Sequence, residues 1–331
     1  MAIRFVDGFD VLTAANLDLK WDVSSGTIVT GIYGKGSALN NYNQTKTLGA
    51  NYATGMVAFH YYTGTTVSAA TILTFLDAAV DQVDLRYNAG GQLYFTRNGT
   101  TIGSMTSFAL VPNQWYWMEI QVTISSSSGV ANLYVNGVSY LSGSSLNTQT
   151  SANAYFGQIN VRAQINGTQN IDNFHFWDTV TGIDVSSFPY GEHLIDSKLA
   201  TGAGDQTQWS NVGASANYLC INNVSNQALD NQYVYTNTSG NIDSYAFANL
   251  AETSGTIGTV AVNALARVDD GMTHVLQLFT QSSAAQAFSA NLSPGATYFN
   301  YQEFFGVDPH TNASWSITGR NNAVFGQKLV V

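Results

Sequence analysis

The stretch that decides the fold lies at residues 115–124, where side chains of two kinds alternate. It reads Trp115-Tyr116-Trp117-Met118-Glu119-Ile120-Gln121-Val122-Thr123-Ile124. One face would carry Tyr116, Met118, Ile120, Val122 and Ile124, and the other Trp115, Trp117, Glu119, Gln121 and Thr123. A period of two residues is typical of a β-strand that is buried on one side. The sequence therefore predicts a strand here, with the first set of side chains in the core.

Further strand runs extend this prediction over the first half of the chain. Residues 131–135 form a run that ends at Asn136-Gly137, the dipeptide best suited to the positive backbone angles of a tight hairpin turn. Residues 171–178 form another run, and Gly-rich or Asn-rich clusters such as 88–91 separate the shorter ones. Short strands with turns of this kind indicate an all-β sandwich or jelly roll.

A second set of strand runs occupies the C-terminal part of the chain. Between the two sets, Ser187-Phe188-Pro189-Tyr190-Gly191 is typical of a connector. We predict two domains, residues 1–180 and 196–331, joined by a connector at 181–195. In the second domain we interpret residues 217–221 as a strand that buries Cys220. We interpret residues 267–272 as a hairpin with Asp-Gly at its turn.

Composition and charge exclude several classes of partner. Of the 331 residues only 10% are charged, and the formal net charge is −10. A polyanion lacks the attraction for phosphates that nucleic-acid binding needs, so we expect no direct nucleic-acid ligand. No apolar run reaches the roughly 18 residues that would span a bilayer, so no membrane insertion is expected. Residues 1–10 lack the apolar segment of a signal peptide.

The first half resembles a known fold family. The resemblance is to a concanavalin A-like, laminin-G-type jelly roll and covers roughly residues 1–180. It is carried by Phe5-Val6-Asp7-Gly8-Phe9-Asp10, residues 115–124, Leu133-Tyr134-Val135-Asn136-Gly137 and Ile171-Asp172-Asn173-Phe174. The resemblance implies an N-terminal laminin-G-like sandwich followed by a C-terminal β-sandwich.

The second half resembles proteins encoded among phage and prophage structural genes. The segments concerned are Gly204-Asp205-Gln206-Thr207-Gln208-Trp209, residues 308–315 and residues 325–330. This resemblance implies a non-enzymatic bacteriophage virion structural protein, on the tail or baseplate or decorating the capsid, in contact with host glycans. Its implied partners are other virion proteins and copies of itself. Its implied location is the virion, after synthesis in the host cytoplasm without a signal peptide.

Two alternatives of other classes stay open. One is a soluble carbohydrate-binding lectin module, and the other is a glycan-degrading hydrolase. A glycosidase needs two carboxyl groups that face one cleft. Glu119 has no second carboxylate at i+2 or i+4, and the other glutamates are isolated. We therefore expect that the protein is not an enzyme and has no catalytic residues.

The candidate glycan contacts are Trp115, Trp117 and Glu119, which share one face of the predicted strand. Exposed aromatic rings beside hydrogen-bonding groups could stack against a sugar ring. The competing interpretation is that both indoles cover another part of the protein, because aromatic side chains bring large areas to bury.

No cofactor is expected. Asp77, Asp81 and Asp84 form the densest acidic cluster and are weak candidates for a structural Ca²⁺ site, but their spacing is not that of an EF-hand loop. In a regular strand Asp81 and Asp84 would also point to opposite faces. The five histidines are far apart in sequence, and none has metal-ligand spacing to another His or to Cys220.

Overall fold

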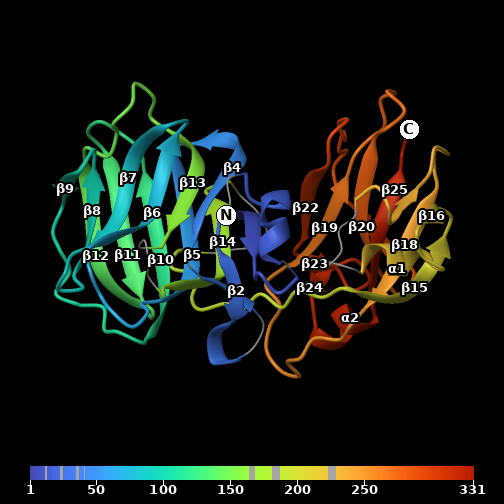
Figure 1. Cartoon of the computed structure of the whole chain (residues 1–331), viewed down its shortest axis with the longest axis horizontal. Helices are drawn as coiled ribbons and strands as arrows, with labels where there is room; N and C mark the ends of the chain where they lie inside the picture. The colour runs from blue at the N-terminus through green and yellow to red at the C-terminus, as the bar shows by residue number, and fades with distance from the viewer. Residues whose placement is uncertain are drawn as a thin grey trace. The chain divides into compact units, whose positions relative to one another are not determined.

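The computed structural model describes residues 1–11, 13–22, 25–34, 37–40, 42–163, 168–180, 187–222 and 229–331. The described chain is almost entirely β and forms two compact units, Met1–Ile195 and Asp196–Val331 (Figure 1). The predicted all-β sandwich class is confirmed. The unit boundary lies at the C-terminal end of the expected connector, so residues 187–195 belong to the first unit.

The first unit contains two large antiparallel sheets. The eight-stranded sheet has the order β12 (Val138–Leu146), β11 (Gly129–Val135), β10 (Trp115–Thr123), β5 (Thr54–Tyr62), β14 (Asn170–Asp178), β3 (Ser37–Asn40) and β2 (Thr27–Thr30), with β1 (Ala2–Asp7) also paired to β14. The six-stranded sheet has the order β4 (Asn43–Tyr52), β13 (Phe156–Arg162), β6 (Ala70–Asp77), β7 (Val80–Tyr87), β8 (Leu93–Arg97) and β9 (Thr100–Ile102). Two short 3-10 helices, η1 (Ala14–Leu19) and η2 (Ile32–Gly34), lie in the loops.

The core of the first unit lies between these sheets. The predicted inward face of β10 is confirmed, because Tyr116, Met118, Ile120 and Val122 all belong to the core. Their partners in the core come from both sheets, among them Phe59, Leu85, Phe95, Phe156, Ile159 and Phe174. Burial of these apolar surfaces is the main stabilising contribution to such a sandwich.

The predicted hairpin at Asn136-Gly137 is also confirmed. Both residues have positive φ, 50° and 77°, and they join β11 to β12 with Val135 paired to Val138. This turn matches the right-handed twist of its strands. It therefore fixes the register of β12 on β11.

The second unit is built around a five-stranded antiparallel sheet. Its order is β15 (Ala200–Thr207), β18 (Ile242–Phe247), β25 (Val324–Leu329), β20 (Leu276–Ser282) and β21 (Ala285–Phe288). Three two-stranded ladders add β16 (Ser210–Val212) with β17 (Tyr233–Tyr235), β19 (Val260–Ala266) with β22 (Phe299–Phe305), and β23 (Val307–Asp308) with β24 (Ala313–Ser314). The helices are α1 (Asn217–Ile221) and α2 (Ile317–Asn322).

Residues 217–221 form helix α1, so the predicted strand is wrong. The amide of Asn217 donates to the backbone oxygen of Trp209 at 2.8 Å and to the carboxylate of Asp243 at 2.7 Å. Asp243 is 26 residues away in sequence, and tertiary context of this kind overrides local strand propensity. Cys220 is buried on α1, as the sequence predicts.

The predicted hairpin at residues 267–272 is wrong as well. Strand β19 ends at Ala266 and pairs with β22, whereas β20 begins only at Leu276 and pairs with β25 and β21. The carboxylate of Asp270 instead accepts hydrogen bonds from the backbone of Met272 and from His274. The segment is therefore a loop between strands of different ladders.

The aromatic residues of the phage-like segments belong to the core of the second unit. Trp315 and Phe325 are buried with ring centroids 6.3 Å apart, and Trp209 packs against the same cluster. Packing accounts for these residues, so their presence does not by itself identify a binding site.

Among the described residues, no helix has the length and apolar character needed to cross a membrane.

Candidate functional site

The outward face of β10 does not offer a glycan-binding surface. Trp117 is 3% exposed and Glu119 is fully buried, while Trp115 is partly exposed and packs beside Tyr62. The expectation that Trp115, Trp117 and Glu119 together contact a glycan therefore needs correction. The competing interpretation, that the aromatic side chains are covered by another part of the protein, describes Trp117.

The cover is the segment 187–195, which sequence analysis had treated as part of a connector. One carboxylate oxygen of Glu119 accepts hydrogen bonds from the backbone N–H groups of Tyr190 at 2.6 Å and Gly191 at 2.9 Å. The ring of Tyr190 also lies 6.1 Å from that of Trp177 on β14. Hydrogen bonds to a buried carboxylate are charge-assisted and strong. Glu119 is therefore an anchor for this segment and not a ligand-binding group.

Three histidines meet where this segment lies on the sheet: His60 and His175 come from strands, and His193 belongs to the segment itself. The ring of His60 on β5 lies 4.7 Å from that of Trp117, and the ring of His175 on β14 lies 5.9 Å from it. His193 in turn lies 6.4 Å from His175. Glu192 receives hydrogen bonds from His60 at 3.0 Å and from the Tyr33 hydroxyl at 2.9 Å. Strand pairing creates this group, and no local motif in the sequence could have revealed it.

Burial dominates the electrostatics of this group. It lowers the pKa of His175 to about 3, and the neighbouring His193 lowers it further. Burial likewise lowers the pKa of His60 and raises that of Asp172 to about 7. Burial disfavours the charged form of each group. His60 and His175 are therefore neutral at pH 7. Among the described residues, no group of three or more His, Cys, Asp or Glu side chains is arranged to hold a metal ion.

Two of the three candidate Ca²⁺ ligands, Asp77 and Asp84, have other partners. Asp77 accepts hydrogen bonds from the Ser151 hydroxyl at 2.7 Å and from the Asn153 amide at 2.9 Å. Asp84 is buried within the six-stranded sheet, and Asp81 is partly exposed, with its pKa raised by burial and by the charge of Asp84. The structure therefore gives no support to a shared Ca²⁺ site.

Asp84 instead belongs to a polar row that crosses the six-stranded sheet. Each of the six strands contributes one residue, and neighbours in the row are directly paired: Thr45, Asn160, Thr74, Asp84, Thr96 and Thr101. Residues that are directly opposite in a ladder share one face of the sheet. The residues on either side of Asp84, Val83 and Leu85, belong to the core. The row therefore lies on the outer face of the sandwich.

Hydrogen bonds hold the middle of this row in place. The Thr74 hydroxyl donates to one oxygen of Asp84 at 2.8 Å, and the Thr96 hydroxyl donates to the other at 3.1 Å. The Asn160 amide donates to the Thr45 hydroxyl at 2.7 Å. Satisfied polar networks of this kind are rigid. The row therefore forms a fixed hydrophilic floor.

Longer side chains flank the row. Arg86 and Tyr94 are paired directly with each other, and each lies two residues from a member of the row. Arg162 lies two residues beyond Asn160, and its Nε donates a hydrogen bond to the side-chain oxygen of Asn160. All three are partly exposed. The Nε of Arg86 is buried and has no hydrogen-bond partner among the described residues. We call this group of nine residues, the row together with Arg86, Tyr94 and Arg162, the polar sheet face.

The polar sheet face can bind a polar ligand that is neutral or carries few charges. With the adjacent Asp81 it combines two carboxylates and two guanidinium groups, so its formal charge is balanced. Hydroxyl, amide and guanidinium groups recognise ligand hydroxyls, and the Tyr94 ring offers an apolar surface. Sequence analysis missed this site. The only local signal was the polar position between core residues on each strand, as in Leu73-Thr74-Phe75 and Val83-Asp84-Leu85.

Comparison with known proteins gives only distant structural similarities. No family model matches the chain, and no curated protein matches it. Similar solved structures include a sialidase (11% identity, TM-score 0.39, covering 54% of this chain and 19% of the sialidase). They also include Trypanosoma rangeli sialidase in complex with 2,3-difluorosialic acid (13% identity, TM-score 0.34, 46% and 27%). A third is a mutant of alginate lyase Aly36B in complex with an alginate trisaccharide (10% identity, TM-score 0.36, 50% and 92%).

These similarities correct one expectation. Sequence analysis predicted that the protein is not an enzyme, whereas the similar structures are glycan-acting enzymes, so that prediction is withdrawn. The match spans only about a fifth to a quarter of the sialidases. At these identities and TM-scores we assign no catalytic activity from the likeness.

Proposed function

We propose that the first unit is a carbohydrate-binding module and that the polar sheet face contacts the glycan. The observation that carries the proposal is the row of six paired polar residues, one from each strand, with Arg86, Tyr94 and Arg162 beside it. A packed floor that holds a few convergent polar groups is typical of ligand sites. Sugars present many hydroxyls on a small apolar body, which suits this combination.

The exposed and buried members of the face have different roles in this proposal. Arg86, Tyr94 and Arg162 contact the sugar, because they are partly exposed. Asp84 lies beneath them, with both oxygens already bonded to Thr74 and Thr96. Arg86 is partly exposed, so its guanidinium offers donors to ligand hydroxyls.

The test is titration of the full chain with a panel of oligosaccharides, measured by calorimetry or by saturation-transfer NMR. Tyr94→Ala and Arg86→Ala should each weaken binding about tenfold, the effect of losing one charged hydrogen bond or one aromatic contact. Trp115→Ala is the matched control, because it removes a partly exposed ring from the opposite sheet. Loss of binding in the Trp115 variant alone would overturn the assignment to the polar sheet face.

We further propose that the chain works on a bacteriophage virion, with other copies of itself and with other virion proteins, where it contacts host glycans. The support for this is the resemblance of segments 204–209, 308–315 and 325–330 to products of phage structural genes. Mass spectrometry of purified particles tests it directly. Absence of the chain from particles would leave a soluble lectin as the remaining form of the proposal.

A further inference from the structure

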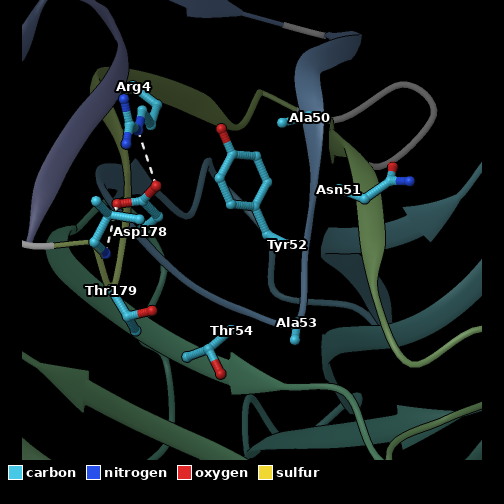
Figure 2. Close-up of a pocket in the computed structure, with 9 residues that line it drawn as sticks. Arg4, Ala50, Asn51, Tyr52, Ala53, Thr54, Asp178 and Thr179 are labelled. Atoms are coloured by element: carbon cyan, nitrogen blue, oxygen red, sulfur yellow. Dashed lines mark hydrogen bonds and ion pairs between the residues drawn. The ribbon is translucent and has the colours of Figure 1, made fainter.

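A second feature of the first unit lies away from the polar sheet face, at the edge of the sandwich. It is an open cavity of about 500 Å³. The lining residues are Arg4, Ala50, Asn51, Tyr52, Ala53, Thr54, Asp178, Thr179 and Val180. They come from β1, from the end of β14, and from the tight connection where the chain passes from β4 in one sheet to β5 in the other. Figure 2 shows Arg4, Tyr52 and Asp178 around the same opening.

Arg4 and Asp178 form an ion pair in this cavity, and they differ in how many of their polar atoms are already bonded. Asp178 is buried, and both of its oxygens are used: one accepts from Arg4 Nε at 2.9 Å and the other from the backbone N–H of Val180 at 3.0 Å. The side chain of Arg4 is 39% exposed. Because Asp178 occupies only Nε, the terminal guanidinium nitrogens have no hydrogen-bond partner among the described residues. The carboxylate thus orients the arginine and leaves its terminal donors available.

Tyr52 adds a second donor on the same side of the cavity. Its ring packs edge-on against Phe176, with centroids 5.1 Å apart, and lies 6.2 Å from Phe156. In Figure 2 its hydroxyl points toward the side of the opening where Arg4 lies. The charge of Arg4 acts on this hydroxyl: burial raises the pKa of Tyr52, whereas Arg4 lowers it. The ring packs on the core, while Tyr52 as a whole is partly exposed and lines the cavity.

We propose that this cavity binds the carboxylate of an acidic sugar, with Arg4 and Tyr52 as the recognising groups. Guanidinium binds carboxylate through paired, charge-assisted hydrogen bonds. The cavity is within the size range of small-molecule sites, which is about 300–1,000 Å³. Asn51, Thr54 and Thr179 supply neutral polar groups for the sugar hydroxyls. Since the chain carries a net charge of −10, the anion is held by this local arrangement and not by long-range attraction. The choice of a sugar as the carrier of the carboxylate rests on the proposed function.

The test uses the full chain and three probes: D-glucuronate, D-glucose and acetate, with affinities measured by NMR titration. We expect glucuronate to bind about tenfold or more tightly than glucose, as a charge-assisted pair predicts. Arg4→Gln should abolish the preference for glucuronate. Arg4→Lys keeps the positive charge but loses the paired donors of the guanidinium group, so it should retain part of the preference. Tyr52→Phe, which removes one hydroxyl from a packed ring, should weaken glucuronate binding several-fold. The Tyr52→Phe variant still tests the inference if the Arg4→Gln variant does not fold.

The outcomes separate this inference from the proposed function. Tyr94→Ala, on the polar sheet face, should leave the glucuronate preference unchanged. Equal binding of glucose and glucuronate, both weakened by Tyr94→Ala, would overturn the acidic-sugar inference and leave the proposed function intact. Acetate binding as tight as glucuronate would overturn the assignment to a sugar. Binding of none of the probes, and of no glycan in the panel, would overturn both.

Discussion

The carboxylate of Glu119 accepts a hydrogen bond from the backbone N–H of Gly191 at 2.9 Å, although the two residues are 72 positions apart. The same oxygen accepts the N–H of Tyr190. Glu119 is fully buried on β10, so this contact fastens the segment 187–195 onto the outer face of the eight-stranded sheet. The rings of His60 and His175 pack against Trp117 next to this contact, and Trp117 is buried although it lies on an outward face.

Removal of this acceptor should destabilise the first unit. We expect Glu119→Ala to lower the free energy of unfolding by about 2–4 kcal/mol, because it leaves two N–H groups without their acceptor and opens a cavity. Glu119→Gln keeps an acceptor oxygen and should cost less than half as much. Urea denaturation of both variants and the wild type measures the difference. A loss below about 0.5 kcal/mol for Glu119→Ala, as at surface positions, would contradict the anchoring role.

The same contact predicts where the first unit can be cut. A fragment of residues 1–195 should unfold at higher denaturant concentration than a fragment of residues 1–180. Residues 187–195 pack on Trp177 and bond to Glu119, and deleting them exposes this part of the sheet to water. Tryptophan fluorescence of the two fragments, with its emission shift on exposure, reports the change. Equal stability of the two fragments would show that the segment contributes little.

Ile120 tests the alternation from which the fold was predicted. It is fully buried in the core of the first unit, so Ile120→Ala should cost about 2–5 kcal/mol. Val138→Ala, at an exposed position of β12, is the control and should cost less than about 0.5 kcal/mol. Thermal or chemical unfolding measures both variants. Similar effects of the two changes would mean that the inward and outward faces are assigned wrongly.

The buried histidines predict a loss of stability in acid. Burial lowers the pKa of His175 to about 3, below its ordinary value of 6.5. A group with a depressed folded-state pKa stabilises the fold above its unfolded-state pKa, and that contribution is lost as the pH falls. Between pH 6 and pH 4, His175 should therefore reduce the free energy of unfolding by up to about 1.4 kcal/mol per pH unit. Burial lowers the pKa of His60 too, so His60 acts in the same direction.

Asp172 acts in the opposite sense over nearly the same range. Its pKa is raised to about 7, so its contribution is complete below pH 4 and is lost as the pH rises to 7. Comparing His175→Gln with the wild type isolates the histidine, because Asp172 is common to both. Unfolding measured at pH 7, 5.5 and 4 should give a smaller acid loss for the variant. An identical pH dependence would show that the pKa of His175 is the same in the folded and the unfolded chain.

The local pattern of the sequence was sufficient to predict most strands and some turns. The alternation at 115–124 and the Asn136-Gly137 turn each depend on neighbouring residues alone, because side-chain period and turn angles are properties of the local backbone. The pattern failed at 217–221 and 267–272. There the contact between Asn217 and Asp243, and the pairing of β19 with β22, join residues far apart in the chain.

Tertiary structure alone decided which residues meet. His60, His175 and His193 come together because β5 pairs with β14 and the segment 187–195 folds back over both. The polar sheet face takes one residue from each of six strands, and the cavity at Arg4 combines β1, β14 and the β4–β5 connection. Strand alternation fixes the face on which a side chain lies, but sheet order and register fix its neighbours. For this protein, therefore, the sequence by itself determined the class of fold, and the candidate binding sites emerged only from long-range strand pairing.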